Sequence, residues 1–484
     1  MNPWLKKVFN FYVFAYAFFF ASRPLSDGDF WWHLKAGEYI VKTRSVPKTD
    51  HFSFTNYGKQ WISHEWLSEA IFYLVYSRLG FNVLIFIFAL ITAFAFWIVF
   101  RRIQAHVFIG AFATWLGVWS ILPTIGVRPR VFTLLFASVY LALLTRYARE
   151  GEGRAIWWLV PIMAVWANLH AGYLLGLVFI AVTIVGVLLD AWSEGEPIRP
   201  LSTRLRTLSL VLLASVGAVS LNPHGLRTYV FPFEFFISPV QQENVMDWLS
   251  PDFHQPELMP LALLILLTVA AFGLSTKRVR PSELLLFLGT LYATLKSNRH
   301  MAIFALVAAP LLADHLQNYL DTTSLAKTFG RSETASSKRL PILLGVLLLL
   351  PLLIFVFRLR AVIYSPPRQE MVAVPLKAVE YMKENQITGN TFTDPNIWGG
   401  YLIWEMPSNP VFIDGRIDMY GDEFVRQFVN ITRGLSDWRE PFNRYGVQVA
   451  IVSSTSVLRL QLQQSPDWQQ VYEDKMAVVF RRRS

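Results

Sequence analysis

The sequence predicts a polytopic membrane protein, an all-α bundle of about eleven transmembrane helices followed by a small extracytoplasmic α/β domain. The chain of 484 residues is 54% hydrophobic and only 16% charged, with 38 Phe and 17 Trp, a composition unusual for a soluble domain. Apolar runs such as 84–100 and 340–357 approach the ~20 residues that cross a bilayer as a helix. From about residue 366 the pattern changes to the short alternating runs of a soluble domain.

Apolar segments in chain order account for the predicted bundle. The N-terminal run has the basic start of a signal peptide, but no small-residue cleavage site follows it, so we expect it to be retained as the first helix. The predicted spans are about 8–22, 81–100, 107–123, 131–145, 156–169, 173–190, 207–221, 258–274, 282–296, 301–313 and 341–358. They divide the chain into a transmembrane domain over 1–358 and a soluble domain over 359–484.

The distribution of Lys and Arg orients these spans in an inner (cytoplasmic) membrane. With the N-terminus in the cytoplasm, the basic loops are cytoplasmic, and residues 22–80 and the tail lie outside. The segment 66–80 is helical in period but has only 15 residues and contains Glu69, so we expect an interfacial or partly inserted helix. Counting it as a span would move the later basic loops to the wrong side.

Charge and cysteine content exclude several classes of protein. The net charge of +10 comes largely from short basic clusters between apolar runs and not from one surface stripe, so it indicates orientation in the bilayer and no nucleic-acid partner. With 0 Cys, disulfides, thiolate metal sites and Cys nucleophiles are excluded. The tail must therefore be held together by packing. It is expected to contain a helix near 374–386 and β-like runs at 390–394, 400–404, 410–414, 447–454 and 476–482.

Two carboxylates, Asp27 and Asp29, directly follow the first span and precede an amphipathic helix. Carboxylates this close to the bilayer can bind a divalent cation, Mg or Mn, or act as a base beside a lipid headgroup. The alternative is a capped helix start, because Asp at an N-cap accepts backbone N–H bonds. Spacing alone does not decide between the two.

The run DGDFWWHLK, followed by a Pro-x-x-Asp and a second helix, resembles the first outer loop of GT-C glycosyltransferases, and in particular that of oligosaccharyltransferase catalytic subunits. The resemblance implies a catalytic base or metal ligand at Asp29 or Asp27, with Lys35 where that family often has Arg. It continues in SHEW, where His64 and Glu65 precede the helix that leads to the second span. A His beside a Glu at the membrane edge can shuttle protons, although a headgroup-level polar cluster anchored by Trp is the alternative.

Basic residues at the outer helix ends are candidates for binding the donor phosphate. Arg128 and Arg130 stand where several GT-C members carry a second acidic residue, so this turn is cationic. Lys296 and Arg299 belong to the turn KSNRH, which resembles the GT-C segment whose basic residue meets the donor phosphate. The alternative for these residues is that they snorkel to the interface.

Further polar residues on the same predicted face form a candidate cavity lining, although each of the histidines alone is more often structural. These are His33, His170, His224 and Arg227. In the tail, NIWGGYLIW has the layout of the Trp-Trp-Asp-Tyr-Gly element of oligosaccharyltransferases. Gly399 and Gly400 replace its acidic position, which argues against recognition of an Asn sequon.

The sequence therefore predicts an integral membrane glycosyltransferase. A sugar would pass from a polyprenyl-phosphate or polyprenyl-diphosphate carrier to a glycan, lipid or protein acceptor outside the cytoplasm. The absence of Walker, Rossmann or other nucleotide motifs agrees with a lipid donor. The alternative is a lipid-linked glycan transporter or glycan-assembly protein without transferase activity. Transporters tend to bury ionisable groups at mid-bilayer, whereas these spans are nearly free of charge.

Overall fold

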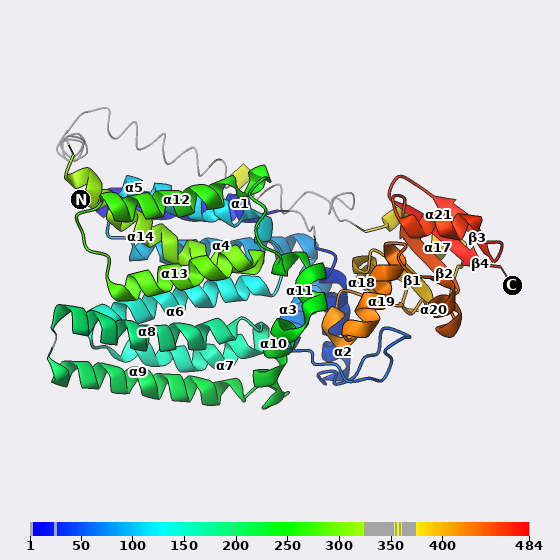
Figure 1. Cartoon of the computed structure of the whole chain (residues 1–484), viewed down its shortest axis with the longest axis horizontal. Coiled ribbons are helices and arrows are strands. Elements are labelled where there is room, and N and C mark those ends of the chain that lie inside the picture. The colour runs from blue at the N-terminus through cyan, green and yellow to red at the C-terminus, as the bar shows by residue number, and fades with distance from the viewer. Residues whose placement is uncertain are drawn as a thin grey trace. The chain divides into compact units, whose positions relative to one another are not determined.

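The computed structural model describes residues 3–23, 27–195, 197–323 and 374–483, with the isolated positions 353, 356, 357 and 360. It is mostly helical with one small sheet near the C-terminus, as the sequence predicts (Figure 1). The chain forms two compact units. The helical unit comprises Met1–Arg23, Asn82–Gly225 and Met246–Pro366, and the α/β unit comprises Pro24–Phe81, Leu226–Val245 and Pro367–Ser484.

The helical unit contains the predicted spans. Its α-helices are α1 (Pro3–Ala21), α4 (Phe81–Arg102), α5 (Val107–Ser120), α6 (Arg130–Glu150), α7 (Leu159–Leu169), α8 (Tyr173–Glu194), α9 (Ile198–Val219), α12 (Met259–Leu274), α13 (Pro281–Lys296) and α14 (Met301–Asp321). Short 3₁₀ turns lie at η1 (Leu122–Thr124), η2 (Arg154–Trp158), η3 (Met246–Trp248), η4 (Pro256–Leu258) and η5 (Asn298–His300). Each span predicted before residue 323 corresponds to one of these α-helices. The span predicted at 341–358 lies outside the described residues.

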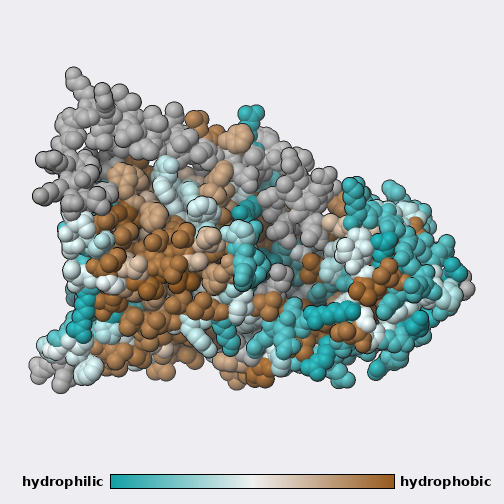
Figure 2. All heavy atoms as spheres, turned by 45° about the horizontal axis from the view of Figure 1, so that its top comes forward, coloured by the Kyte–Doolittle hydropathy of each residue, from teal (hydrophilic) through white to brown (hydrophobic). Residues whose placement is uncertain are grey.

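Several helices of this unit have the length and surface of membrane spans. Six helices in the described part of the chain are long and apolar enough to cross a bilayer, and two shorter apolar helices accompany them. Apolar side chains such as Leu213 and Leu266 are 68% and 64% exposed on α9 and α12, and Figure 2 shows hydrophobic residues spread over these helices. Such a surface is stable in lipid and not in water. The chain is therefore a multi-pass membrane protein.

Helix packing in this unit is organised around α14 and α8. Helix α14 packs against α5, α12 and α13, and α8 packs against α6, α9 and α13 (Figure 1). The start of α13 is fixed by Asp190 at the end of α8, whose carboxylate accepts the backbone N–H of Ser282 at 2.9 Å and its hydroxyl at 2.6 Å. A carboxylate bound to the first amide groups of a helix also complements the helix dipole.

The α/β unit combines one small sheet with helices from three parts of the chain. Its strands are β1 (Thr391–Asp394), β2 (Val449–Ser453), β3 (Trp468–Glu473) and β4 (Ala477–Arg482), in the order β1-β2-β4-β3. Strands β1 and β2 are parallel, and the other pairs are antiparallel. Its helices are α2 (Phe30–Thr43), α3 (Trp66–Leu79), α10 (Arg227–Ile237), α11 (Pro239–Asn244), α17 (Leu376–Glu384), α18 (Ile397–Glu405), η7 (Ile417–Met419), α19 (Asp422–Thr432), α20 (Arg439–Arg444) and α21 (Val457–Gln464).

Two strand predictions in the tail are wrong, and one strand was missed. The run 400–404 is part of α18, and a short apolar run buried on all sides carries no periodicity that distinguishes a helix from a strand. The run 410–414 is not a strand, although Val411 forms isolated bridges with Ser53 and Thr391. Strand β3 was missed because its residues are mostly polar and half exposed. The boundary predicted at residue 358 falls outside the described residues and stays a prediction.

Candidate active site

Asp29 lies at the N-terminal end of α2, where the sequence allows either a helix cap or a functional carboxylate. Its side chain makes no capping hydrogen bond, and its Oδ1 accepts the indole N–H of Trp32 at 3.3 Å. Asp27 instead holds the backbone, because its Oδ1 accepts the N–H of Asp29 at 3.1 Å. Asp27 thus positions the turn, and the Asp29 carboxylate is not used as a cap.

The tail approaches the Asp29 carboxylate through Gly415. A Cβ atom added at Gly415 would lie 1.9 Å from Asp29 Oδ1 and 3.0 Å from Trp32 Nε1. Only a residue without a side chain permits this approach. The first loop and the tail therefore build the surroundings of Asp29 together, within the α/β unit.

Arg416, the next residue, fixes this arrangement. Its guanidinium is fully buried and pairs with Asp414 through Nε at 2.9 Å and Nη2 at 2.7 Å. Nη2 also lies 2.9 Å from Asp50 Oδ1 in the first loop. The guanidinium carbon lies 4.9 Å and 4.5 Å from the ring centroids of Phe52 and Trp61. Paired charges and stacked aromatic rings are what a buried Arg requires, so this cluster ties the tail to the first loop.

Behind α2, imidazoles alternate with carboxylates in a buried network. His33 Nδ1 lies 3.4 Å from Glu69 Oε1, and His33 Nε2 lies 3.6 Å from Glu65 Oε2. His64 Nε2 lies 3.4 Å from the other oxygen of Glu65. At the far end, the hydroxyl of Ser63 donates to Glu69 Oε2 at 2.6 Å. The structure thus brings together His33, His64 and Glu65, which the sequence predicts as site residues.

The charges of this network hold protons on its imidazoles. Burial alone would lower the pKa of His33, but its hydrogen bond to Glu69 and the charge of Glu65 raise that pKa overall. Burial would likewise lower the pKa of His64, and the charge and hydrogen bond of Glu65 outweigh it. Burial raises the pKa of Asp418 to about 6, although the charge of His64 acts in the opposite direction. The charges of the network therefore favour the protonated form of both imidazoles.

Asp27 and Asp29 do not fit a preformed metal centre. One oxygen of each accepts an N–H group. Over the residues that the structure describes, no group of three or more His, Asp or Glu side chains is arranged to hold a metal ion. Two carboxylates engaged with N–H donors fall short of the octahedral oxygen set that Mg²⁺ demands. We therefore assign no step of the predicted sugar transfer to a cation held by Asp27 and Asp29.

In the helical unit, three of the predicted phosphate-binding residues are associated with η3. Arg130 Nη1 and Arg128 Nη1 lie 2.9 Å and 3.3 Å from Asp247 Oδ2. The guanidinium carbon of Arg299 lies 4.9 Å from the ring centroid of Trp248. Burial would raise the pKa of Asp247, but the charges of Arg130, Arg128 and Arg299 lower it overall. The turn that the sequence predicts to be cationic thus joins Arg299 of the KSNRH turn in a cluster of three guanidinium groups around one carboxylate.

The other predicted residues lie at helix ends and in turns. Lys296 is exposed at the end of α13, and Arg227 is exposed at the start of α10. His170 Nδ1 lies 2.7 Å from the hydroxyl of Thr133 and accepts the N–H of Gly172 at 2.9 Å. His224 lies in the turn after α9. Their roles in lining a cavity or binding phosphate stay predictions.

Sequence reasoning missed several partners of these residues. Glu69 was interpreted only as a charge that argues against a span, yet it is buried beside His33. Asp247 follows α11 in a loop without a motif. Asp414 ends a run interpreted as a strand and Arg416 follows that run, and only their opposite charges in an apolar surrounding hinted at a buried pair. Such partners are far apart in the chain, so spacing could not reveal them.

Known proteins match this chain in fold and not in sequence. No model of a protein family matches it, and no curated protein does. The structure is similar to that of the oligosaccharyltransferase AglB from Archaeoglobus fulgidus in complex with an inhibitory peptide and a dolichol-phosphate, with a TM-score of 0.59 and 12% identity over 93% of this chain and 70% of that chain. The apo form of the Archaeoglobus fulgidus oligosaccharyltransferase gives 0.58 and 13% over the same shares.

A weaker match is ArnT from Cupriavidus metallidurans bound to undecaprenyl phosphate. Its TM-score is 0.47 at 13% identity over 99% of this chain and 98% of that chain. The archaeal matches confirm the GT-C resemblance at the level of the fold.

Proposed function

We propose that this protein is a glycosyltransferase that moves a sugar from a polyprenyl-phosphate or polyprenyl-diphosphate carrier to an acceptor outside the cytoplasm. The fold that it shares with the archaeal oligosaccharyltransferase supports the class, since one structure of that enzyme holds a dolichol-phosphate. The observation that carries the proposal is Asp29, a carboxylate that caps no helix and is held between Trp32 and Gly415.

In this proposal Asp29 is the catalytic base. It accepts the proton of the acceptor nucleophile as that atom attacks the sugar, and the bond between the sugar and the carrier phosphate breaks. The buried His33 supports the charged form of Asp29, because the negative charges around the imidazole, that of Asp29 included, outweigh burial and raise the pKa of His33. Asp27 is a positioning residue that fixes the backbone of Asp29.

The leaving phosphate is assigned to the arginines of the helical unit. Arg128, Arg130 and Arg299 are held by Asp247 and Trp248, so their guanidinium groups are ordered before a substrate binds. Guanidinium groups bind phosphate through parallel hydrogen bonds, and their charge stabilises the phosphate as the sugar leaves. No residue of this cluster needs to move a proton.

The test is Asp29→Asn in a transfer assay with a panel of polyprenyl-phosphate sugars. The change removes charge but little volume, so we expect an unchanged unfolding temperature and a loss of transfer of about 100-fold or more. Asp27→Asn should cost as much or somewhat less. The matched control is Asp437→Asn at an exposed position of the same unit, which should retain full transfer. Near-normal transfer by the Asp29→Asn protein would refute the assignment.

A further inference from the structure

A cavity lies between five helices of the helical unit. It encloses about 870 Å³ of empty space, part of it open to solvent, between α4, α6, α8, α13 and α14. Its walls are largely apolar, with leucine and valine side chains from α6, α8, α13 and α14. Charged side chains lie among them, including Arg102, Arg149 and Arg280. An apolar chamber that also contains guanidinium groups is suited to an amphipathic molecule.

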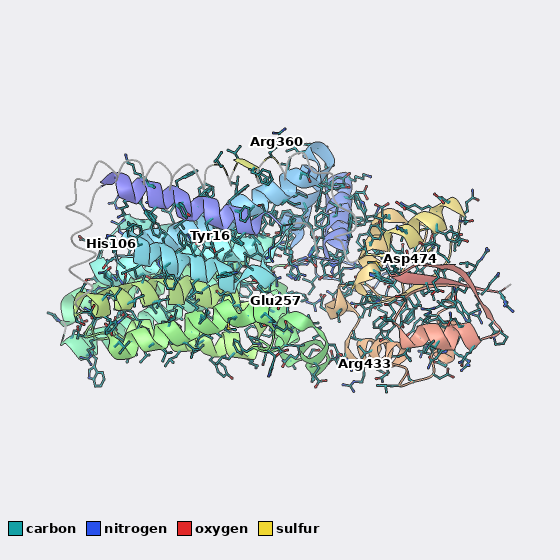
Figure 3. All side chains as sticks on the ribbon, turned by 90° about the horizontal axis from the view of Figure 1, so that it is seen from above. Tyr16, His106, Glu257, Arg360, Arg433 and Asp474 are labelled. Carbon is teal, nitrogen blue, oxygen red and sulfur yellow. The ribbon has the colours of Figure 1, made fainter. Side chains whose placement is uncertain are left out.

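The cavity lies at the end of the bundle opposite the Asp247 cluster. Its charged residues come from the C-terminal ends of α4, α6, α8 and α14 and the N-terminal end of α13. The Asp247 cluster uses the other ends of α6 and α14. His106 and Glu257, which Figure 3 labels, mark these two ends, His106 on the side of the cavity and Glu257 on the side of the cluster. The cavity is therefore separate from the proposed donor site.

The carboxylates of the cavity are occupied by other bonds. Asp190 binds the start of α13 through Ser282. Asp314 Oδ1 accepts the backbone N–H of Gln104 at 3.0 Å. Glu283 accepts the backbone N–H of Arg280 at 3.2 Å and lies 3.6 Å from Arg149. These carboxylates act as caps and partners within the protein.

Arg102 forms no ion pair with these carboxylates, although the negative charge of Asp314 acts on it. Its Nη1 donates to the carbonyl of Leu306 at 3.1 Å, and its Nη2 lies 3.4 Å from the hydroxyl of Thr145. Its Nε is buried without a hydrogen bond, and no carboxylate of the described residues forms an ion pair with it. A guanidinium inside a membrane bundle is costly unless an anion compensates its charge.

We propose that this cavity binds the phosphate group of a membrane lipid, with Arg102 as the anion ligand and the apolar walls around the acyl or prenyl chain. Basic pockets between transmembrane helices are suited to lipid headgroups, and a guanidinium binds phosphate oxygens through parallel hydrogen bonds. The apolar lining favours a lipid over free phosphate, which has no group to fill it. Two sources share this chemistry, a bilayer phospholipid and a prenyl phosphate.

The experiment measures thermal unfolding of the full-length, lipid-stripped protein in detergent, by tryptophan fluorescence. The probes are dihexanoyl-phosphatidylglycerol, farnesyl phosphate, inorganic phosphate and dihexanoylglycerol, which lacks phosphate. A bound probe raises the unfolding temperature by an amount that grows with the logarithm of its concentration divided by its dissociation constant. We expect Arg102→Gln to lower the affinity for the lipid phosphate that stabilises the wild-type protein about tenfold or more. Arg206→Gln, at an exposed position of α9, is the matched control and should change nothing.

The outcomes separate the sources. A loss of the phosphatidylglycerol effect in Arg102→Gln supports a phospholipid, and a loss of only the farnesyl phosphate effect supports a prenyl phosphate. Farnesyl phosphate can also bind the proposed donor site, so only the part of its effect that depends on Arg102 counts. The proposal is overturned if no probe depends on Arg102, or if inorganic phosphate or dihexanoylglycerol acts as strongly. Arg102→Lys, which keeps the charge without the fork, replaces the Gln variant if that variant does not fold and should weaken binding several-fold.

Discussion

Replacing Arg299 by Lys distinguishes phosphate binding by this residue from simple anchoring at the membrane interface. The Arg299 guanidinium stacks on Trp248 and contributes to the charge around Asp247. Anchoring at the interface needs only a positive charge, which Lys supplies equally well. Binding a phosphate through two parallel hydrogen bonds needs the planar fork of Arg.

We therefore expect Arg299→Lys to lower the affinity for the lipid donor about tenfold or more, because charge-assisted hydrogen bonds are lost. Donor titrations of Arg299→Lys and Arg299→Ala measure this effect. Arg439→Lys is the matched control, since Arg439 stacks on Trp438 at 5.2 Å on the exposed surface. Wild-type affinity in Arg299→Lys would argue against paired hydrogen bonds, and wild-type affinity in both variants would remove Arg299 from the donor site.

The buried histidines make stability depend on pH. The pKa of His33 is raised because, against the effect of burial, Glu69 and Glu65 favour its charged form. The native state then binds this proton more tightly than the unfolded state does. Its contribution to stability is complete below pH ~6.5 and is lost as the pH rises through the higher native pKa.

Unfolding temperatures measured from pH 5 to 9 test this linkage. The wild-type protein should lose stability as the pH rises above ~6.5, and His33→Gln should lose less over the same range. His64 has a raised pKa for a similar reason and should retain part of the slope in that variant. His254→Gln, at a fully exposed position, is the control and should follow the wild-type curve. An unchanged slope in His33→Gln would contradict the linkage.

At the scale of elements, the cluster around Arg416 holds the first loop against the tail. Replacing Arg416 by Met leaves the buried carboxylates of Asp50 and Asp414 without a cation. We expect the free energy of unfolding to fall by about 3–5 kcal/mol, the usual cost of breaking a buried pair. Denaturant unfolding followed by fluorescence measures it.

The control for this prediction is Arg439→Met. Its ion pair with Asp437 is 61% exposed on both sides, so the loss should stay below about 1 kcal/mol. A similarly small loss in Arg416→Met would show that the buried cluster does not stabilise the unit.

The helices of the fold could be predicted from sequence much better than the site. Apolar length alone located every α-helix of the helical unit before residue 323, because a helix in lipid must satisfy its own backbone and be apolar along its length. The same signal is absent in α18, which is buried among other elements and was interpreted as a strand. The pattern of apolar and polar residues reflects the environment of a helix or strand. It does not distinguish the two where the element is surrounded by the protein interior on all sides.

The sequence could group candidate site residues only where they are near one another in the chain. Asp29 and His33 lie close together at the start of the first loop, and His64 and Glu65 lie next to each other near its end; the structure places all four around α2. Asp247 and Arg416 meet their partners across long stretches of chain. No spacing rule encodes a contact between residues so far apart, so these partners needed the structure.

At the scale of the whole molecule, the composition of the α/β unit constrains the membrane topology. Its segments contact one another: Arg416 pairs with Asp50, and the hydroxyl of Ser238 donates to Asp422 at 2.6 Å. All of them must therefore lie on one side of the bilayer. Helices α4 to α9 lie between the first two segments, and counting each as one crossing returns the chain to the same side.

Between the second segment and the tail, the described spans are α12, α13 and α14. Three crossings would leave the tail on the wrong side, and the span that the sequence predicts at 341–358 would supply the fourth. We expect reporter fusions after residues 103, 150, 278 and 323 to indicate the cytoplasm, and fusions at 45, 240 and 420 to indicate the outside, because the basic loops then lie inside. The fusions at 323 and 420 form a matched pair on either side of the predicted span 341–358. The same reading from both would refute the odd number of spans, and a cytoplasmic reading at 45, 240 and 420 together would keep the count but reverse the orientation.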